Sequence, residues 1–228
     1  MDPAKQGAWS GRIGVGILGF AHGHVNGYCE EWKRFPDMGI ELAAGWDHDA
    51  ARLRKAQDAF GLAAETDAKA LLRRTDVAAV VIAAETSLHA ELAVMAAEAG
   101  KSIVLQKPMA LTLAEAERIA EAVERHGVPF TLAWQMRVDP QNLKIKQLLE
   151  SGELGNVYMV RRRHGLSLGL QPEFASSWHA DPGYNRDIWA DDAAHPIDFL
   201  HWLLGMPESV TAELASLHPG GIPMDNGI

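Results

Sequence analysis

The sequence is nearly without cysteine: Cys29 is the one such residue among 228, so an intrachain disulfide is excluded. A lone cysteine is typical of proteins from a reducing compartment, and we expect a cytoplasmic location. Cys29 falls in a segment of helical pattern, where a buried thiol with a packing role is expected rather than a catalytic one.

Long apolar runs and basic clusters are also missing. Apolar runs such as Val77–Ala84 end well before membrane-spanning length. The formal net charge is −9 and no basic run occurs, which argues against nucleic acid as a partner. Met1–Ser10 lack the apolar stretch of a secretory signal and are expected to form a flexible leader.

Up to about residue 136, short apolar segments alternate with segments of helical periodicity. This alternation predicts βαβ units and an α/β fold, a Rossmann-type doubly wound parallel sheet. Helix-start and helix-stop signals support it, including a Thr112/Glu115 capping box. The expected strands cover 12–18, 40–46, 77–84, 102–106 and 128–133, and the expected helices cover 23–34, 49–60, 87–99 and 112–126.

After Asp139-Pro140 the pattern changes. A helix is expected to about Glu150, and residues 156–164 and 210–216 alternate as antiparallel strands do. We therefore expect three parts: a leader (1–10), a dinucleotide-binding domain (11–136), and a second α+β domain on a largely antiparallel sheet (137–228) for substrate binding and oligomerisation. That sheet is expected to be incomplete, which favours a dimer or tetramer in which another chain covers its edge.

Glycines follow the first predicted strand, where a dinucleotide's pyrophosphate would need close backbone approach to a helix N-terminus. Two registers compete. Gly14–Gly19 spell G-x-G-x-x-G, but they fall inside the strand. The register placed after the strand is Gly19-Phe20-Ala21-His22-Gly23-His24, in which Ala21 and His24 stand where glycines are usual. A glycine-rich turn without nucleotide remains an alternative.

Asp47 directly follows the second predicted strand. A carboxylate there can accept hydrogen bonds from ribose hydroxyls and repel a 2′-phosphate, which favours NAD over NADP. Capping of the next helix by Asp47 or Asp49 is the alternative. Arg52 and Arg54 leave NADP open as the minority option.

A reactive lysine is expected at the end of the strand over 102–106. Gln106-Lys107-Pro108 lies where a parallel sheet presents functional groups, and a lysine there could stabilise negative charge developing on a substrate oxygen. A solvated surface lysine is the ordinary alternative.

Several ordered motifs resemble the Gfo/Idh/MocA family of oxidoreductases. Gln106-Lys107-Pro108 is similar to the family's Glu-Lys-Pro, and Glu85-Thr86-Ser87-Leu88-His89 to its Pro-Asn-Ser-x-His loop. Residues 152–163 resemble the first strand of the family's second domain, and 191–195 its Asp-x-x-x-His motif. The resemblance runs from about Arg12 to Ser216.

The resemblance implies an NAD-dependent dehydrogenase that acts on CH–OH groups of a sugar, polyol or similar small molecule. It implies Lys107, Asp191 and His195 as the catalytic residues, with His195 as general base and Asp191 on the same helix face. The implied cofactor-binding set is Gly19, Phe20, Ala21, His22, Gly23, His24, Asp47, Ala84, Glu85, Ser87, His89, Gln106 and Lys107.

Departures from the family pattern keep other functions open. Gln106 replaces the family's glutamate, and Tyr184–Trp189 replace a glycine run before Asp191. An NAD-using lyase or glycosidase on the same scaffold is one alternative, and a non-catalytic cofactor sensor is another. No metal is expected, because His22 and His24 have no evident third ligand in the sequence.

Overall fold

The computed structural model describes residues 11–165, 167, 171–213 and 215, so the expected leader over 1–10 lies outside the described residues. The chain divides into two compact units, of which the first ends at Leu132 and the second begins at Ala133. In the described part of the chain, no helix is both long and apolar enough to cross a membrane.

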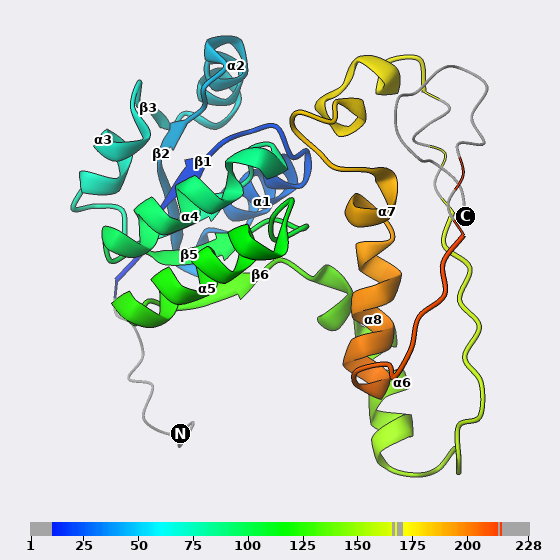
Figure 1. The fold of residues 1–228 in the computed structure, drawn as a ribbon. Coiled ribbons are helices and arrows are strands. Elements are labelled where there is room, and N and C mark those ends of the chain that lie inside the picture. Colours follow the sequence, from blue (N-terminus) through cyan, green and yellow to red (C-terminus); the bar gives the residue numbers. More distant parts are fainter. Residues whose placement is uncertain (1–10, 166, 168–170, 214, 216–228) are drawn as a thin grey trace. The chain divides into compact units, whose positions relative to one another are not determined.

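The first unit is built on a parallel sheet of six strands (Figure 1) in the order β3-β2-β1-β4-β5-β6. The strand order reverses direction between β1 and β4, the point at which such sheets bind ligands. The strands are β1 (Ile13–Leu18), β2 (Ile40–Trp46), β3 (Ala63–Ala64), β4 (Ala79–Ile82), β5 (Ser102–Leu105) and β6 (Phe130–Leu132). This confirms the predicted α/β Rossmann-type parallel sheet.

Helices connect the strands and begin where the sequence places caps. Asp49 accepts hydrogen bonds from the N–H groups of Ala51 and Arg52 at the start of α2, and Thr112 with Glu115 forms the predicted capping box of α5. The helices of this unit are α1 (His24–Arg34), α2 (Ala50–Phe60), α3 (Ala68–Arg73), α4 (His89–Glu98) and α5 (Leu113–His126), with short 3₁₀ turns η2 (Pro36–Met38) and η3 (Thr86–Leu88).

Each face of the sheet has its own buried core. Val15 and Ile17 of β1 pack with Val25 and Cys29 of α1 on one face, together with residues of α2. Leu18 belongs to the second core, which contains buried residues of α3, α4 and α5. Figure 1 shows α4 and α5 side by side across that face. The two layers of helices hold the strand ends in fixed positions, which is what a binding edge requires.

The second unit contains mostly helices in its described part. They are η4 (Gln135–Arg137), α6 (Pro140–Glu150), η6 (Phe174–Ser176), η7 (Trp178–Ala180), α7 (Ile188–Asp191) and α8 (Ala194–Leu204). Arg137 binds Asp198 through two hydrogen bonds, one of them 2.9 Å from Nε to Oδ2, and Lys146 Nζ donates to the carbonyl oxygen of Trp202 at 3.0 Å. These contacts fasten η4 and α6 to α8.

The expected antiparallel strands are not observed in the described residues. Residues 157–165 and 210–213 have no regular secondary structure, and 215 makes a single bridge; residues 214 and 216 lie outside the described residues. A strand needs a neighbour for its N–H and C=O groups. In the described residues of the second unit, no strand offers one. The antiparallel sheet expected in the second domain is therefore not confirmed by the described residues.

Candidate functional site

The residues that follow four strands lie along one edge of the sheet. Backbone hydrogen bonds fix this register: Gly19 N donates to Trp46 O at 2.7 Å, Ala83 N to Leu18 O at 2.9 Å, and Gln106 N to Ile82 O at 2.9 Å. The ends of β1, β2, β4 and β5 are therefore neighbours. The segments predicted from sequence to bind a cofactor all leave the sheet at this edge.

The turn after β1 requires glycine at its first position. Gly19 has φ +90°, and a Cβ there would lie 2.4 Å from both the nitrogen and the Cα of Ala84. Gly14 and Gly16 lie within β1, so the competing G-x-G-x-x-G register is not the turn. The preferred register beginning at Gly19 is the one that leads from the strand into a helix.

Space is available where a pyrophosphate would rest. Helix α1 begins at His24 with Gly23 at its N-cap, and no side chain caps the helix. A Cβ at Gly23 would meet nothing within 4 Å. A helix N-terminus carries partial positive charge and suits an anion. The turn therefore fits the diphosphate of a dinucleotide, although Ala21 and His24 replace the usual glycines.

The two histidines of the turn connect it to the segment after β5. His22 is buried, with Nε2 at 3.0 Å from the backbone oxygen of Lys107. His24 Nδ1 lies 3.4 Å from Oε1 of Gln106. Contacts within the protein thus account for the positions of both rings.

Gln106 and Lys107 are both buried at the end of β5. The Gln106 amide donates to the hydroxyl of Tyr28 on α1 at 2.9 Å. A glutamate could not donate that bond while ionised. The departure from the family motif is therefore accommodated by a specific partner.

His89 joins the ends of β4 and β5. Its Nδ1 lies 2.9 Å from the carbonyl oxygen of Pro108, and its Nε2 lies 3.1 Å from that of Ala84. The ring is fully buried at the start of α4. His89 therefore positions the Lys107-Pro108 segment through the backbone. Ser87 lies in η3, the turn that connects Ala84 to His89 along the chain.

The side chain of Asp47 is completely buried, and its carboxylate has a full set of partners. Its Oδ2 accepts from Phe20 N at 2.7 Å and from Arg52 Nε at 3.0 Å, while Oδ1 accepts from Asp49 N at 2.8 Å and from Arg52 Nη2 at 2.9 Å. A carboxylate offers about four lone-pair sites. Asp47 therefore ties the glycine turn to the end of β2, whereas Asp49 is the residue that caps α2.

Arg52 lies between two buried carboxylates. Its Nη2 is 2.7 Å from Oε1 of Glu85, and His48 Nε2 is 2.9 Å from Oε2 of the same Glu85. Burial would lower the pKa of Arg52, but the hydrogen bonds and charges of Asp47 and Glu85 outweigh it and raise that pKa. The spacing along the sequence gives no signal for this cluster, which joins residues 37 positions apart.

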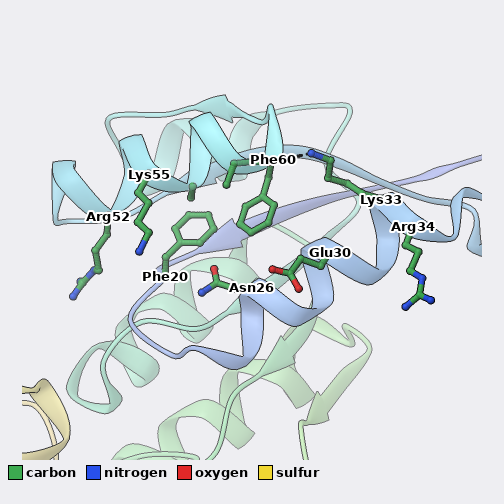
Figure 2. A pocket seen from close by; sticks show the side chains of 10 residues that line it. Phe20, Asn26, Glu30, Lys33, Arg34, Arg52, Lys55 and Phe60 are labelled. Atoms are coloured by element: carbon green, nitrogen blue, oxygen red, sulfur yellow. Dashed lines mark hydrogen bonds between the residues drawn. The ribbon is translucent and has the colours of Figure 1, made fainter. Parts of the chain in front are cut away.

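A hollow of about 720 Å³ lies between α1 and α2 (Figure 2). Figure 2 shows the rings of Phe20 and Phe60 inside it and charged side chains such as Lys33 and Glu30 along its rim. Arg52 belongs both to this lining and to the Asp47 cluster. The hollow therefore adjoins the Asp47 cluster at the end of β2.

In the second unit, Asp191 and His195 do not share a helix, so the expectation of one helix face is wrong. Asp191 ends α7, a turn covers Asp192 and Ala193, and α8 begins at Ala194. Pro196 stands in the first turn of α8, where its missing N–H costs nothing. The chain thus restarts a helix between the two residues.

Asp191 is buried and held by two side chains that the sequence did not reveal as its partners. His179 Nδ1 lies 2.7 Å from Asp191 Oδ2, and Asn185 Nδ2 donates to the same oxygen at 3.0 Å. The His179 ring stacks on Trp178 with centroids 3.8 Å apart. Asp191 is therefore fixed from the preceding loop.

His195 is also largely buried, at 6% exposure. Its ring and that of Trp134 form a T-shaped pair with centroids 5.7 Å apart, and the ring of His164 lies 6.4 Å away. An imidazole is a side chain suited to proton transfer. The second unit thus contains a buried histidine and a buried carboxylate, and the first unit contains a buried lysine.

Comparison with known proteins agrees with this arrangement. Residues 11–133 match the family model described as "Oxidoreductase family, NAD-binding Rossmann fold", and residues 142–227 match the GFO/IDH/MocA C-terminal domain. An inositol 2-dehydrogenase of Salmonella paratyphi B is 30% identical over 86% of this chain and 54% of its own length. A levoglucosan dehydrogenase of Pseudarthrobacter phenanthrenivorans is 29% identical over 92% of this chain and 54% of its own length.

A solved structure shares the fold. The WlbA dehydrogenase from Bordetella pertussis, in complex with NADH and UDP-GlcNAcA, has a TM-score of 0.79 and 25% identity over 92% of this chain and 60% of that one. The chain spans about half the length of the curated relatives it matches. The matched family models cover both units. The chain belongs to the Gfo/Idh/MocA family of oxidoreductases, and residues 11–133 are its NAD-binding Rossmann domain.

Proposed function

We propose that this protein is an NAD-dependent oxidoreductase that transfers a hydride between nicotinamide and a carbinol carbon of a hydroxylated small molecule, a sugar or polyol. The observation that carries the proposal is the buried Asp47 carboxylate bonded to the N–H of Phe20 in the Gly19 turn. Relatives named inositol 2-dehydrogenase and levoglucosan dehydrogenase support the substrate class.

The cofactor would lie along the strand edge of the first unit. Gly19, Gly23 and the start of α1 would hold its pyrophosphate, and Asp47 its adenosine ribose. The remaining contacts would come from Phe20, Ala21, His22, His24, Ala84, Glu85, Ser87, His89, Gln106 and Lys107. Nicotinamide supplies the hydride chemistry when bound.

The catalytic groups would be Lys107, Asp191 and His195. His195 takes the proton of the substrate hydroxyl as general base, because an imidazole is suited to proton transfer near neutral pH. The ammonium of Lys107 stabilises the oxygen as negative charge develops on it. Asp191, held by His179 and Asn185, orients the base or a neighbouring hydroxyl.

Three further features belong to the same proposal. Residues 156–164 form an antiparallel strand of the second domain when a partner strand is present, which their alternation supports. The protein acts as a homo-oligomer through that sheet. It works in the cytoplasm, a location that the presence of a single cysteine supports. That cysteine, Cys29, is buried, and burial raises the pKa of its thiol to about 12.

Titration with NADH and with NADPH, followed by nicotinamide fluorescence, tests the proposal first. Tight NADH binding and weaker NADPH binding are expected, and a screen of sugars and polyols should then give NADH-producing turnover. Binding without net turnover would favour the lyase or sensor functions. No binding of either cofactor would refute the proposal.

Substitution of Lys107 tests the chemistry separately. Lys107→Ala should abolish turnover and weaken NADH binding far less, because the main part proposed for its ammonium is on the substrate oxygen. Lys69→Ala, on the exposed side of α3, removes the same charge elsewhere and serves as the control. Unchanged turnover in Lys107→Ala would remove this lysine from the mechanism.

A further inference from the structure

Glu85 stands out among the buried acids, because it follows β4 and not the ribose-binding strand β2. It is 2% exposed, and its two oxygens have different partners: Oε1 meets Arg52 at 2.7 Å and Oε2 meets His48 at 2.9 Å. Its backbone oxygen accepts from Leu88 N at 2.9 Å. Glu85 is thus a fixed anion beside the Asp47 site.

Arg52 is the cation that both acids share. It occupies two of the four acceptor positions on Asp47, through Nε at 3.0 Å and Nη2 at 2.9 Å. A ribose diol can reach Asp47 only when Arg52 gives up those positions. A guanidinium released there would be available to pair with a 2′-phosphate, which carries about two negative charges. What holds Arg52 after its release therefore decides which cofactor binds.

We propose that Glu85 determines the choice of NAD(H) over NADP(H), by retaining Arg52 when the cofactor ribose takes its place on Asp47. This inference rests on the proposed function, since it concerns the same cofactor site. Glu85 keeps the guanidinium away from the 2′ position by holding it at Oε1. The preference for NAD(H) then depends on an acid 38 residues beyond Asp47, counted as 85 − 47.

The raised pKa of Arg52 agrees with this arrangement, because the charges of both acids favour the protonated guanidinium in spite of burial. His48 lies against both partners, with Nε2 2.9 Å from Oε2 of Glu85 and 3.0 Å from Nη2 of Arg52, while Oε1 of Glu85 meets Arg52. Glu85 and Arg52 are therefore each held by a further contact, which fixes their geometry relative to one another.

The test measures dissociation constants for NADH and NADPH by fluorescence titration. Glu85→Gln keeps the shape of the side chain and removes its charge. The ratio of the NADPH constant to the NADH constant should fall at least about tenfold, since one released charge pair of this kind is worth about 1.4 kcal/mol or more. Asp76→Asn is the matched control, because Asp76 also pairs with an arginine (Arg74) but precedes β4, at the opposite edge of the sheet.

The same substitution made in an Arg52→Gln variant tests the role of Arg52. In Arg52→Gln, adding Glu85→Gln should produce no gain in NADPH binding, because no guanidinium remains to be released. A gain that persists there, or an unchanged ratio in Glu85→Gln alone, would overturn the proposal. Glu85→Asp keeps the charge but shortens the reach to Arg52, and should give a smaller fall in the ratio; an unchanged ratio in this variant would also count against it.

The outcomes separate this proposal from the function on which it rests. Wild-type protein that binds neither cofactor refutes the proposed function. Wild-type protein that prefers NADH, together with a Glu85→Gln variant of equal preference, leaves the function standing and refutes the part given to Glu85.

Discussion

His89 and Pro108 are joined by a 2.9 Å contact between the imidazole Nδ1 and the prolyl carbonyl oxygen, deep in the first unit. The other ring nitrogen reaches Ala84 O at 3.1 Å. His89→Ala would leave a cavity and two carbonyl groups without this partner. We expect it to lower the free energy of unfolding by about 2–4 kcal/mol, measured by urea denaturation.

The control for that measurement is His126→Ala, which removes an exposed imidazole at the end of α5 and should leave the urea midpoint nearly unchanged. Equal midpoints for the two variants would contradict a clamping role for His89.

Gly19→Ala should destabilise the first unit. Alanine would be strained at φ +90°, and its methyl group would lie 2.4 Å from the backbone of Ala84. We expect a loss of at least about 2 kcal/mol, seen as a lower unfolding temperature. A variant as stable as the wild type would show that the turn can rearrange.

Gly23→Ala separates binding from folding at the same turn. The backbone there is right-handed and the Cβ would enter open space, so stability should change by less than about 1 kcal/mol. If the pyrophosphate rests on α1, the added methyl should weaken NADH binding by about tenfold, because close backbone approach is lost. Undiminished affinity would move the pyrophosphate away from Gly23.

The cap at Asp49 should make stability depend on acid pH. Hydrogen bonds from the N–H groups of Arg52 and Ala51 hold the pKa of Asp49 below its ordinary value of 3.8. A pKa lowered by folding means stabilisation that is complete above the unfolded value and is lost as the pH falls through the folded one. The difference in unfolding temperature between wild type and Asp49→Ala should therefore be larger at pH 7 than near pH 3.

Asp58→Ala, on the exposed side of the same helix, provides the comparison and should show no such trend. A difference for Asp49→Ala that stays constant across the acid range would assign its effect to causes other than the charged cap.

We expect His179 to influence turnover by holding Asp191 in place, without contacting the cofactor. Its Nδ1 meets Asp191 Oδ2 at 2.7 Å, so His179→Asn would loosen a proposed catalytic carboxylate. Misplacement of such a group by about 1 Å can cost about a hundredfold, and we expect a fall in kcat of about ten- to a hundredfold. NADH affinity should stay the same, and the pH–rate profile should shift.

His201→Asn, an exposed change on α8, should leave kcat and the profile unaltered. If both histidine variants behave alike, His179 has no positioning role.

Much of the first unit could be predicted because its signals are local. Strand β2 and the capped helix α5 follow from apolar periodicity and cap residues, which act within one turn or strand. The two-residue strand β3 and the helix α3 were not anticipated, since so short a strand has no measurable period. The glycine turn was placed correctly because a glycine inside a strand cannot begin a helix.

The remaining features depend on contacts distant in sequence. The bonds of Arg52 with Glu85 and of His179 with Asp191 follow from the fold, not from spacing. The prediction of a single helix through Asp191 and His195 is wrong, because the i, i+4 spacing of the two residues contains no information about the turn at Asp192-Ala193. The antiparallel strand over 156–164 was inferred from alternation, which reports a side-chain pattern but not the presence of a neighbour.

The strand order β3-β2-β1-β4-β5-β6 places Gly19, Asp47, Ala84 and Gln106 at one edge although 87 residues (106 − 19) separate the first from the last. A ligand seated on that edge can be held only by a domain in which every crossover has formed. Saturation with cofactor should therefore protect slowly exchanging amides throughout both helical layers, including α3 and α5, and should raise the melting temperature with cofactor concentration as mass action requires.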